Sequence, residues 1–427
     1  MKKFIMLGYL GLIISGILTE VPAQAAIPAI ERAALIALYN STNGDSWTDN
    51  SGWKTPPLYS DGFALPGTED SWYGVDVNAE HVIWLDLDSN HLIGSIPPEL
   101  GNLTNLQRLY LHSNQLTGCI PPELGNLTHL YDLGLFVNEL SGSIPPELGN
   151  LTNLKYLHLM SNLLSGSIPP ELGNLSNLTW LYLHQNQLTG IIPAELEDLT
   201  NLKYLYLSSN QLTGSIPSEL GNLTNLTGLS LSDNQVTGSI PPELGNLTNL
   251  IWLWVHSNQL SGIIPPELGN LTNLERVWLS SNQLTGIIPP ELGNLSNLLY
   301  LIINDNQLTG PLPIELMNLT SLIENESDFC TNYIYTDNAA LRDFLNTKQI
   351  GGDWESCQLP LICECDINVD GKCDMQDWLL FGEDWGRTDC NEAGVDCECD
   401  LNGDGKCDMQ DWLLFGEEWG RTDCPIP

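Results

Sequence analysis

Leucines and other apolar residues recur along most of the chain with a fixed period of 24 positions. One copy, LTNLQRLYLHSNQLTGCIPPELGN, runs from Leu103 to Asn126, and no later copy contains an insertion or a deletion. A degenerate first copy begins at Ala79, and an eleventh breaks off after Leu319. A fixed period of this size predicts a solenoid, in which each repeat stacks on its neighbours. The other copies begin at Leu127, Leu151, Leu175, Leu199, Leu223, Leu247, Leu271 and Leu295.

Within a copy, Leu109 and Leu111 alternate with polar or aromatic residues, and this alternation predicts a short strand. One copy cannot bury its own leucines, so we expect the strands to stack in parallel over a continuous leucine core. Gly118 and Pro121 predict a turn and an extended segment on the outer side. A buried amide such as Asn114 would satisfy backbone groups of the neighbouring coil. Asn114 recurs as Asn138, Asn162, Asn186, Asn210, Asn234, Asn258, Asn282 and Asn306.

The phrase L-x-x-L-x-L-x-x-N-x-L-x-G-x-I-P-x-x-L-G-N resembles the leucine-rich repeat. Its G-x-I-P ending resembles the plant-type subclass, which is found in receptor ectodomains and in inhibitors of wall-degrading enzymes. The resemblance covers ten copies, residues 79–318. It implies an α/β repeat solenoid, mostly β, that winds into a superhelix with a cap at each end. The repeat itself carries no catalytic chemistry, so function must lie in the variable positions, the caps or the tail.

Two segments are predicted to cover the ends of this solenoid. Residues 26–78 would form the N-terminal cap, with a helix from Ile30 to Tyr39, and the W-x-G-V phrase resembles the same cap in plant-type repeats. That family usually has a cysteine pair in this cap and the chain has none, so aromatic packing should hold it. Residues 319–362 would form the C-terminal cap and linker. The aromatic cover would come from Trp47, Trp53, Trp72 and Tyr73.

Within the C-terminal cap, residues Ala339 to Lys348 predict a helix. Cys330 and Cys357 flank this helix at a spacing that suits a single disulfide. Cys119 stands alone, at a position where most other copies have Ser or Ile. It is interpreted as a free thiol, with an intermolecular bridge as the alternative.

The outward positions of the predicted strands are rich in aromatic residues and should line the concave face. Alternation keeps these rings out of the leucine core, and a large exposed aromatic patch usually marks an interaction surface. A protein or glycan ligand is therefore expected there, and a cross-strand brace is the alternative. Gly228 and Ser230 interrupt the rings and could leave a pocket beside them. The predicted ligand-binding residues are Tyr156, Trp180, Tyr182, Tyr204, Tyr206, Trp252, Trp254 and Trp278.

Three histidines of this face, His112, His184 and His256, are each three repeats apart. Strands lie about 4.8 Å apart, so neighbouring members of the set would be roughly 14 Å apart, too far to share a metal ion. They are interpreted as polar contacts. The sequence also lacks a nucleophile–base pairing, a zinc H-E-x-x-H motif and a phosphate loop, and we expect no enzyme activity.

The N-terminal 25 residues resemble a secretory signal that would be removed. Lys2 and Lys3 precede an apolar run and an A-x-A site, an arrangement that looks bacterial; an uncleaved anchor is the alternative. The net charge of −39 argues against nucleic acid and anionic membranes as partners. Eleven cysteines fit an oxidising compartment. We expect a secreted protein that is not inserted in a membrane once the signal is gone. Asn-x-Ser/Thr sites recur at the repeat junctions, but the consensus itself generates them.

Residues 363–427 contain a second repeat, with a period of 34 residues. Each copy includes the 12-residue motif D-x-N-x-D-G-x-x-D-x-x-D, first from Asp366 and then from Asp400. This is the oxygen-ligand spacing of an EF-hand-type calcium loop. Two such loops in tandem predict a small disulfide-rich domain with two Ca²⁺ sites, although its eight cysteines allow 105 connectivities. The first loop would use Asp366, Asn368, Asp370, Lys372 through its carbonyl, Asp374 and Asp377. The second would use Asp400, Asn402, Asp404, Lys406 through its carbonyl, Asp408 and Asp411.

The duplicated loop resembles the dockerin module, which docks extracellular proteins onto cohesins. The family's recognition pair falls on Met375-Gln376 and Met409-Gln410, whereas Gly382 and Gly416 would end the following helices early. The sequence leaves two hypotheses: a secreted binding protein with a calcium-stabilised tail, or a non-catalytic subunit of an extracellular polysaccharide-degrading assembly. The alternative for the tail is an end domain with no partner.

Overall fold

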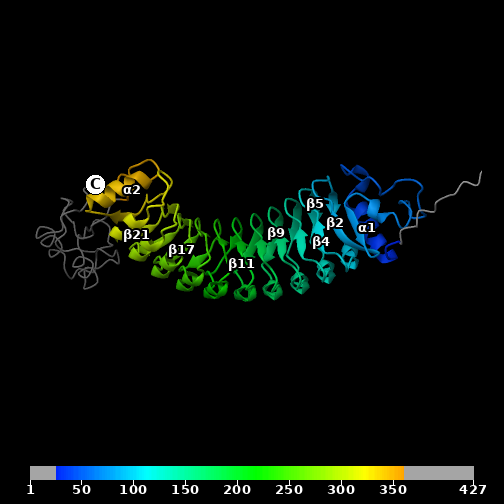
Figure 1. The fold of residues 1–427 in the computed structure, drawn as a ribbon, viewed down its shortest axis with the longest axis horizontal. Coiled ribbons are helices and arrows are strands. Elements are labelled where there is room, and N and C mark those ends of the chain that lie inside the picture. The colour runs from blue at the N-terminus through cyan, green and yellow to red at the C-terminus, as the bar shows by residue number, and fades with distance from the viewer. Residues whose placement is uncertain (1–25, 360–427) are drawn as a thin grey trace, which may run out of the picture. The chain divides into compact units, whose positions relative to one another are not determined.

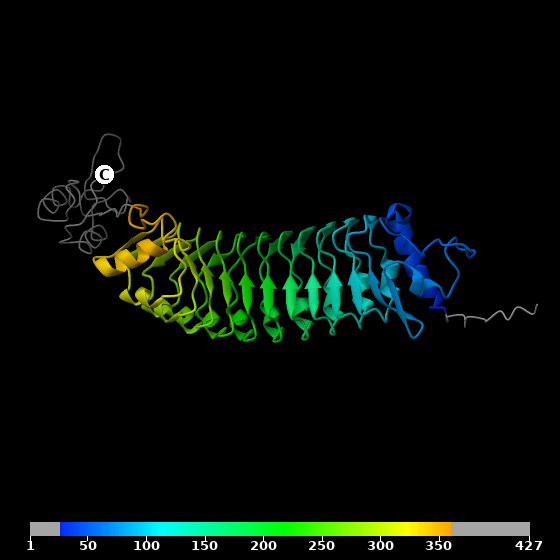
Figure 2. The same cartoon turned by 45° about the horizontal axis from the view of Figure 1, so that its top comes forward.

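The computed structural model describes residues 26–359. Contacts between residues divide this part of the chain into two compact units, which meet in the sequence between Gln187 and Leu188. In each unit, successive coils add one short strand to a parallel sheet and one helical turn to another edge (Figures 1 and 2). The consensus leucines of the coils lie between these layers and are almost completely buried, whereas Leu163, outside the consensus, is 46% exposed. This architecture is the predicted repeat solenoid.

A single coil shows why the sequence folds in this way. In the copy that starts at Leu103, Leu109 is fully buried in strand β4, Arg108–Tyr110, while both of its neighbours point outward and are half-buried. Gly118 ends the second strand with φ +77°, a conformation that favours glycine. Gly125 allows adjacent helical turns to approach closely, because a Cβ there would lie 2.4 Å from the Glu147 carbonyl oxygen. The predicted strand, turn and core residues are all confirmed.

The first unit begins with the cap and continues through the early coils. In its main sheet β1 pairs antiparallel with β2, and the later strands are parallel. Its helix and main-sheet strands are α1 Ala29–Ser41, β1 Val75–Asn78, β2 His81–Asp86, β4 Arg108–Tyr110, β6 Asp132–Gly134, β8 Tyr156–His158 and β10 Trp180–Tyr182. Its outer strands are β3 Ile93–Ser95, β5 Gln115–Gly118, β7 Glu139–Gly142 and β9 Leu163–Ser167.

The second unit repeats the same plan and ends in the C-terminal cap, with every strand pair parallel. Its main-sheet strands are β12 Tyr204–Tyr206, β14 Gly228–Ser230, β16 Trp252–Trp254, β18 Arg276–Trp278 and β20 Tyr300–Ile302. The outer strands are β11 Gln187–Gly190, β13 Gln211–Leu212, β15 Thr237–Gly238, β17 Gln259–Gly262, β19 Gln283–Gly286, β21 Gln307–Pro311 and β22 Tyr333–Tyr335. Strand β11 starts at Gln187, the last residue of the first unit. The helix of the second unit is α2 Ala339–Lys348.

The recurring asparagine joins each coil to the preceding one. Asn258 donates from Nδ2 to the carbonyls of Leu231, Val255 and His256, at 3.0, 3.1 and 3.1 Å, and its Oδ1 accepts from the N–H of Val236 at 3.0 Å. The same pattern recurs along both units, for example at Asn162. These bonds confirm the expected role of the asparagine.

The N-terminal cap is held by rings and by a buried ion pair. Trp53 and Trp72 are completely or almost completely buried, with ring centroids 4.7 Å apart. Arg32 of α1 is paired with Glu69 and, at 2.8 Å, with Asp61. The helix and the aromatic cover are confirmed except at Tyr73, which is 39% exposed, so that its expected place in the cover was wrong.

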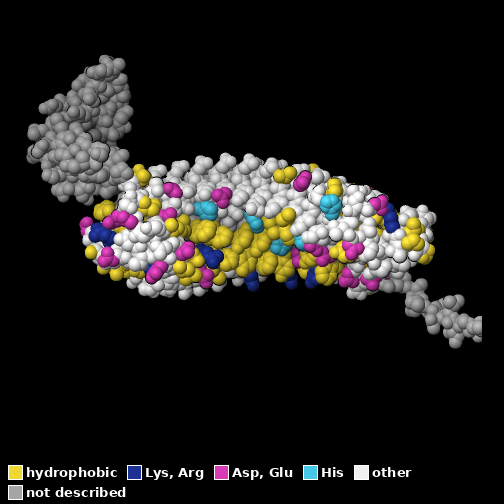
Figure 3. Space-filling model, turned by 90° about the horizontal axis from the view of Figure 1, so that it is seen from above, with side chains coloured by type: hydrophobic (Ala, Val, Ile, Leu, Met, Phe, Trp, Pro, Cys, Tyr) yellow, Lys and Arg dark blue, Asp and Glu magenta, His cyan; other side chains and the backbone are white. Residues whose placement is uncertain are grey.

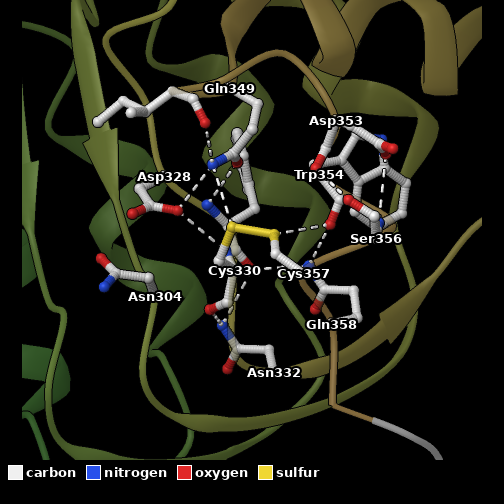
Figure 4. Close-up of a disulfide and its surroundings, with 12 residues drawn as sticks. Asn304, Asp328, Cys330, Asn332, Gln349, Asp353, Trp354, Ser356, Cys357 and Gln358 are labelled. Carbon is white, nitrogen blue, oxygen red and sulfur yellow. Dashed lines mark hydrogen bonds between the residues drawn. A yellow bond between two sulfur atoms is a disulfide. The ribbon is translucent and has the colours of Figure 1, made fainter.

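The C-terminal cap contains the predicted helix α2 and the predicted disulfide. Cys330 and Cys357 are bonded, with their Cα atoms 5.0 Å apart, and Cys119 is a free, exposed thiol. Figure 4 shows Gln349 and Asn332 on either side of this bond. Nε2 of Gln349 donates to Oδ1 of Asp328, and Nδ2 of Asn332 donates to the carbonyl of Cys330. No helix within residues 26–359 is long and apolar enough to cross a bilayer.

Candidate ligand-binding face

Alternate residues of the main-sheet strands point away from the leucine core and form what we call the strand face. Hydrophobic side chains gather in a band over these strands (Figure 3). All eight residues predicted to bind a ligand lie on this face, and each is half-buried. The first unit carries Tyr156, Trp180 and Tyr182, and the second carries Tyr204, Tyr206, Trp252, Trp254 and Trp278.

One end of the first unit's strand face is polar. The Tyr110 hydroxyl donates to Oδ2 of Asp132 at 2.5 Å, while Oδ1 of Asp132 is buried without a hydrogen-bond partner. Burial raises the pKa of the Asp132 carboxyl, and burial together with this carboxylate raises the pKa of Tyr110. The guanidinium of Arg108 lies 4.6 Å from the ring centroid of Trp84.

The middle of the first unit's face is a cluster of packed rings. Tyr156 and Trp180 meet edge to face at 5.0 Å, and His158 lies 5.1 Å from Tyr182. Burial lowers the pKa of His158 to about 4, so this ring is neutral at physiological pH. His158 was not among the site residues predicted from the sequence. A histidine between aromatic residues in adjacent repeats was the signal available.

The second unit's strand face is dominated by indoles. Trp254 lies 5.1 Å from Trp278 and 6.1 Å from Trp252, and the ring planes of both pairs are within 21° of parallel. The N–H groups of all three indoles are buried and have no hydrogen-bond acceptor. A buried donor without an acceptor is costly, so this cluster is poorly satisfied in the free protein.

The expected pocket beside Gly228 and Ser230 is absent, and that prediction was wrong. Tyr204 and Trp252 approach to 6.0 Å although β14 lies between their strands. Tyr206 also lies over Gly228, where a Cβ would be 3.1 Å from its hydroxyl. Rings from both sides therefore lean over the two small residues and fill the gap, and Gly228 and Ser230 are buried.

Open grooves run beside the strand face, along the residues that precede each strand. In the second unit the lining is mostly polar, with side-chain amides at repeat spacing, so a ligand on the rings there would find hydrogen-bonding groups next to them. In the second unit the groove has a volume of about 590 Å³ and is lined by Lys203, Asn225, Thr227, Asn249, Ile251, Asn273, Glu275 and Asn297. In the first unit it has a volume of about 390 Å³ and is lined by Gln107, His129, Tyr131, Asn153 and Lys155.

Two of the histidines interpreted as polar contacts lie close to the hydroxyl of the following serine. Nδ1 of His112 is 3.3 Å from the Ser113 hydroxyl, and Nδ1 of His256 is 3.1 Å from the Ser257 hydroxyl. His112 also stacks on Phe136 at 4.1 Å. Burial lowers the pKa of both histidines. Residues 26–359 contain no group of three or more His, Cys, Asp or Glu side chains placed to hold a metal ion. The twelve predicted calcium ligands, from Asp366 to Asp411, lie outside the described residues.

The comparisons with known proteins agree with this geometry. The family model described as "Leucine-rich repeat region" matches residues 181–324, and the one described as "Leucine Rich Repeat" matches residues 81–103, 105–127 and 153–175. The crystal structure of a plant ice-binding protein is 30% identical, with 67% of this chain and 90% of that chain covered and a TM-score of 0.55. The chain belongs to the leucine-rich repeat family.

This leucine-rich repeat protein is also similar to plant receptors. The ectodomain of the Arabidopsis receptor kinase HAESA, in complex with an N-terminally extended IDA peptide hormone, is 32% identical; 72% of this chain and 49% of that chain are covered, with a TM-score of 0.57. PEPR1–AtPEP1 is 30% identical over 71% and 52% of the two chains, with a TM-score of 0.54. The chain thus spans about half the length of these receptor chains. A comparison with curated proteins gave no match.

Proposed function

We propose that this leucine-rich repeat protein is a secreted, non-enzymatic binding protein that takes a peptide or protein partner on its strand face. The observation that carries the proposal is the indole cluster of Trp252, Trp254 and Trp278, whose stacked rings are half-buried on the strand face and keep part of their apolar surface open to a partner. Aromatic residues of this kind dominate most binding interfaces. The peptide-bound receptor ectodomains to which the chain is similar favour a peptide over a glycan.

The experiment is a pull-down from the native secretome, with the full chain as bait. Three baits are compared: the wild type, Trp254→Ala, and the double variant Asp366→Ala with Asp400→Ala, each with and without calcium. A partner of the strand face should be lost with Trp254→Ala and kept by the double variant. Partners that bind all three baits equally would argue against the proposed site, and enrichment of polysaccharide would favour a glycan ligand.

We further propose that residues 363–427 bind two calcium ions through Asp366, Asn368, Asp370, Lys372, Asp374 and Asp377 and through the six equivalent residues Asp400 to Asp411. The support is the ligand spacing, since carboxylates this close would repel one another without a cation. Calorimetry on the full chain should give a stoichiometry near two. The double variant should lose most of the binding, whereas Glu383→Ala, outside the loops, should keep it. A shortened chain that ends at Leu359 should be unaffected by chelator.

The second candidate function is that of a non-catalytic subunit of an extracellular polysaccharide-degrading assembly, docked through a cohesin. Its support is the resemblance of the tail to a dockerin, with the identical pairs Met375-Gln376 and Met409-Gln410 in its two copies. In the same pull-down, a cohesin-bearing partner should depend on calcium and be insensitive to Trp254→Ala. If no cohesin-bearing protein is captured from the secretome of an organism that encodes cohesins, this candidate function is ruled out.

A further inference from the structure

The arginines of the described residues fall into two groups. Residues 26–359 contain four arginines, in a chain with 53 acidic residues. In the caps, Arg32 is paired with Asp61 and Glu69, and Arg342 with Glu355 at 2.7 Å. The other two, Arg108 and Arg276, occupy the same position of the repeat on the strand face. Within the described part of the chain, neither makes an ion pair or a side-chain hydrogen bond.

Both strand-face arginines are held by aromatic rings. The Cζ atom of Arg276 lies 5.8 Å from the ring centroid of Trp252 on the preceding main-sheet strand and 5.3 Å from that of Tyr300 on the next one. The Cζ atom of Arg108 lies near Trp84 in the same way, and 5.0 Å from the centroid of Tyr131. Each site combines a Trp, an Arg in the following repeat and a Tyr in the repeat after that, with Tyr300 in β20 and Tyr131 one residue before β6.

The chemistry of the guanidinium indicates what such a site binds. Contact with aromatic rings stabilises the positive charge and limits the motion of the side chain. It does not satisfy the N–H donors, which lie in the guanidinium plane and number five. Arg276 is half-buried, but none of its side-chain nitrogens is buried without a partner, so these donors remain open to a ligand on the face. A carboxylate matches the donor geometry, because its two oxygens accept two parallel N–H bonds.

We propose that Arg276 binds the carboxylate of an aspartate or glutamate side chain in the peptide ligand, with Arg108 as a second such site in the first unit. This inference rests on the proposed peptide-binding function. Arg276 is the cleaner of the two, since Arg108 is close enough to Asp132 to favour its ionised form without forming an ion pair. The carboxylate of a uronate sugar would have the same local chemistry, and the experiment separates the two sources.

The experiment selects a phage-displayed library of random linear peptides on the full chain. Wild-type protein should enrich peptides with Asp or Glu at a fixed position relative to their aromatic residues. Arg276→Gln should lose that preference, and Arg276→Lys should recover only part of it, since an ammonium cannot make the bidentate contact. Arg342→Gln, which removes a cap arginine that already has a partner, is the matched control and should select the same peptides as the wild type.

The strongest selected peptide is then synthesised with Glu and with Gln at the fixed position. On wild-type protein the Gln peptide should bind about 10-fold more weakly or worse, whereas Arg276→Gln should not distinguish the two. The comparison on wild-type protein holds even if Arg276→Gln unfolds. Enriched peptides without an acidic preference would overturn the Arg276 assignment and leave peptide binding intact. If no peptide is enriched, the Arg276 assignment and peptide binding both fail, and only a folded protein partner of the strand face remains for the pull-down to detect. Arg276-dependent binding of uronate oligosaccharides alone would overturn the peptide assignment.

Discussion

Inside each coil, the recurring asparagine gives the buried backbone groups around it a partner, whereas on the strand face several buried polar atoms have none. Asn258 makes four hydrogen bonds in the coil interior, while the indole N–H groups of Trp252 and Trp254 and one oxygen of Asp132 make none. The interior is nearly the same in every repeat, and the face differs from one repeat to the next. The comparison teaches that stability and recognition reside in different positions of the same repeat, and substitutions should separate them.

The largest effect should come from the interior. Asn258→Ala removes the partners of the Val236 N–H and of carbonyls such as that of Leu231, which stay buried. Each unsatisfied buried group costs about 1–3 kcal/mol, so the unfolding free energy should fall by about 3 kcal/mol. Denaturant titration measures it. Asn249→Ala, at an exposed asparagine with one bond to the Thr224 carbonyl, should cost below about 0.5 kcal/mol. Equal losses would contradict the comparison.

On the strand face, Trp252→Ala and Trp254→Ala should each weaken ligand binding by at least about 1 kcal/mol. The free energy of unfolding should fall by less than the free energy of binding, because these rings are half-buried and their N–H groups have no hydrogen-bond partner to lose. Trp53→Ala is the matched control: this ring is completely buried in the cap, and its loss should cost about 3–5 kcal/mol of stability. Lost stability with unchanged binding in the two face variants would mean that the indoles only brace the strands.

Gly228→Ala tests whether the rings over β14 are held in place. The added methyl would lie 3.0–3.1 Å from Tyr204, Trp252 and Tyr206, so these side chains must move apart. Overpacking of this size should destabilise the protein by about 1 kcal/mol and change tryptophan fluorescence. Ser230→Ala adds no atom and serves as the control. An unchanged spectrum would show that the three side chains can accommodate the methyl group without moving, contrary to their close approach in the structure.

The smallest effect should be the pH dependence due to His158. Its pKa in the folded protein is about 4, below the usual value of about 6.5, because the ring is buried. The unfolded chain therefore binds a proton that the folded chain does not, and stability is full above about pH 6.5 and falls toward pH 4. Between pH 7 and pH 6 the loss should be about 0.7 kcal/mol. His158→Gln should remove this component of the pH profile, and exposed His129→Gln should leave it.

The sequence predicted the features that recur with the 24-residue period and those that are local to one cap. Leu109 and its equivalents, the asparagine ladder, helix α2 and the Cys330–Cys357 disulfide all follow from local patterns that a single coil or cap repeats or encloses. The positions of the outward residues also followed from alternation. The position of each residue relative to the core was therefore predictable from one repeat.

What the sequence did not predict depends on how side chains of different repeats lean toward one another. Small residues at Gly228 and Ser230 indicate space, but only the structure shows that rings from β12 and β16 fill it. The same holds for Arg276, which has no acidic partner within residues 26–359 because of its surroundings rather than its position in the repeat. Tyr73 was misplaced because an aromatic residue in a cap can pack on either side of its backbone.

The asparagine ladder has a direction. Asn114 bonds to backbone groups of the coil before it, such as the N–H of Leu92 and the carbonyl of Leu87. At the other end, Asn332 of the C-terminal cap does the same for Leu308 and Ile303. A coil is thus completed only by the coil that follows it. During synthesis on the ribosome, the asparagine bonds to each repeat can form only after the next repeat has emerged. A chain that is stopped early therefore ends in one coil that lacks these hydrogen bonds.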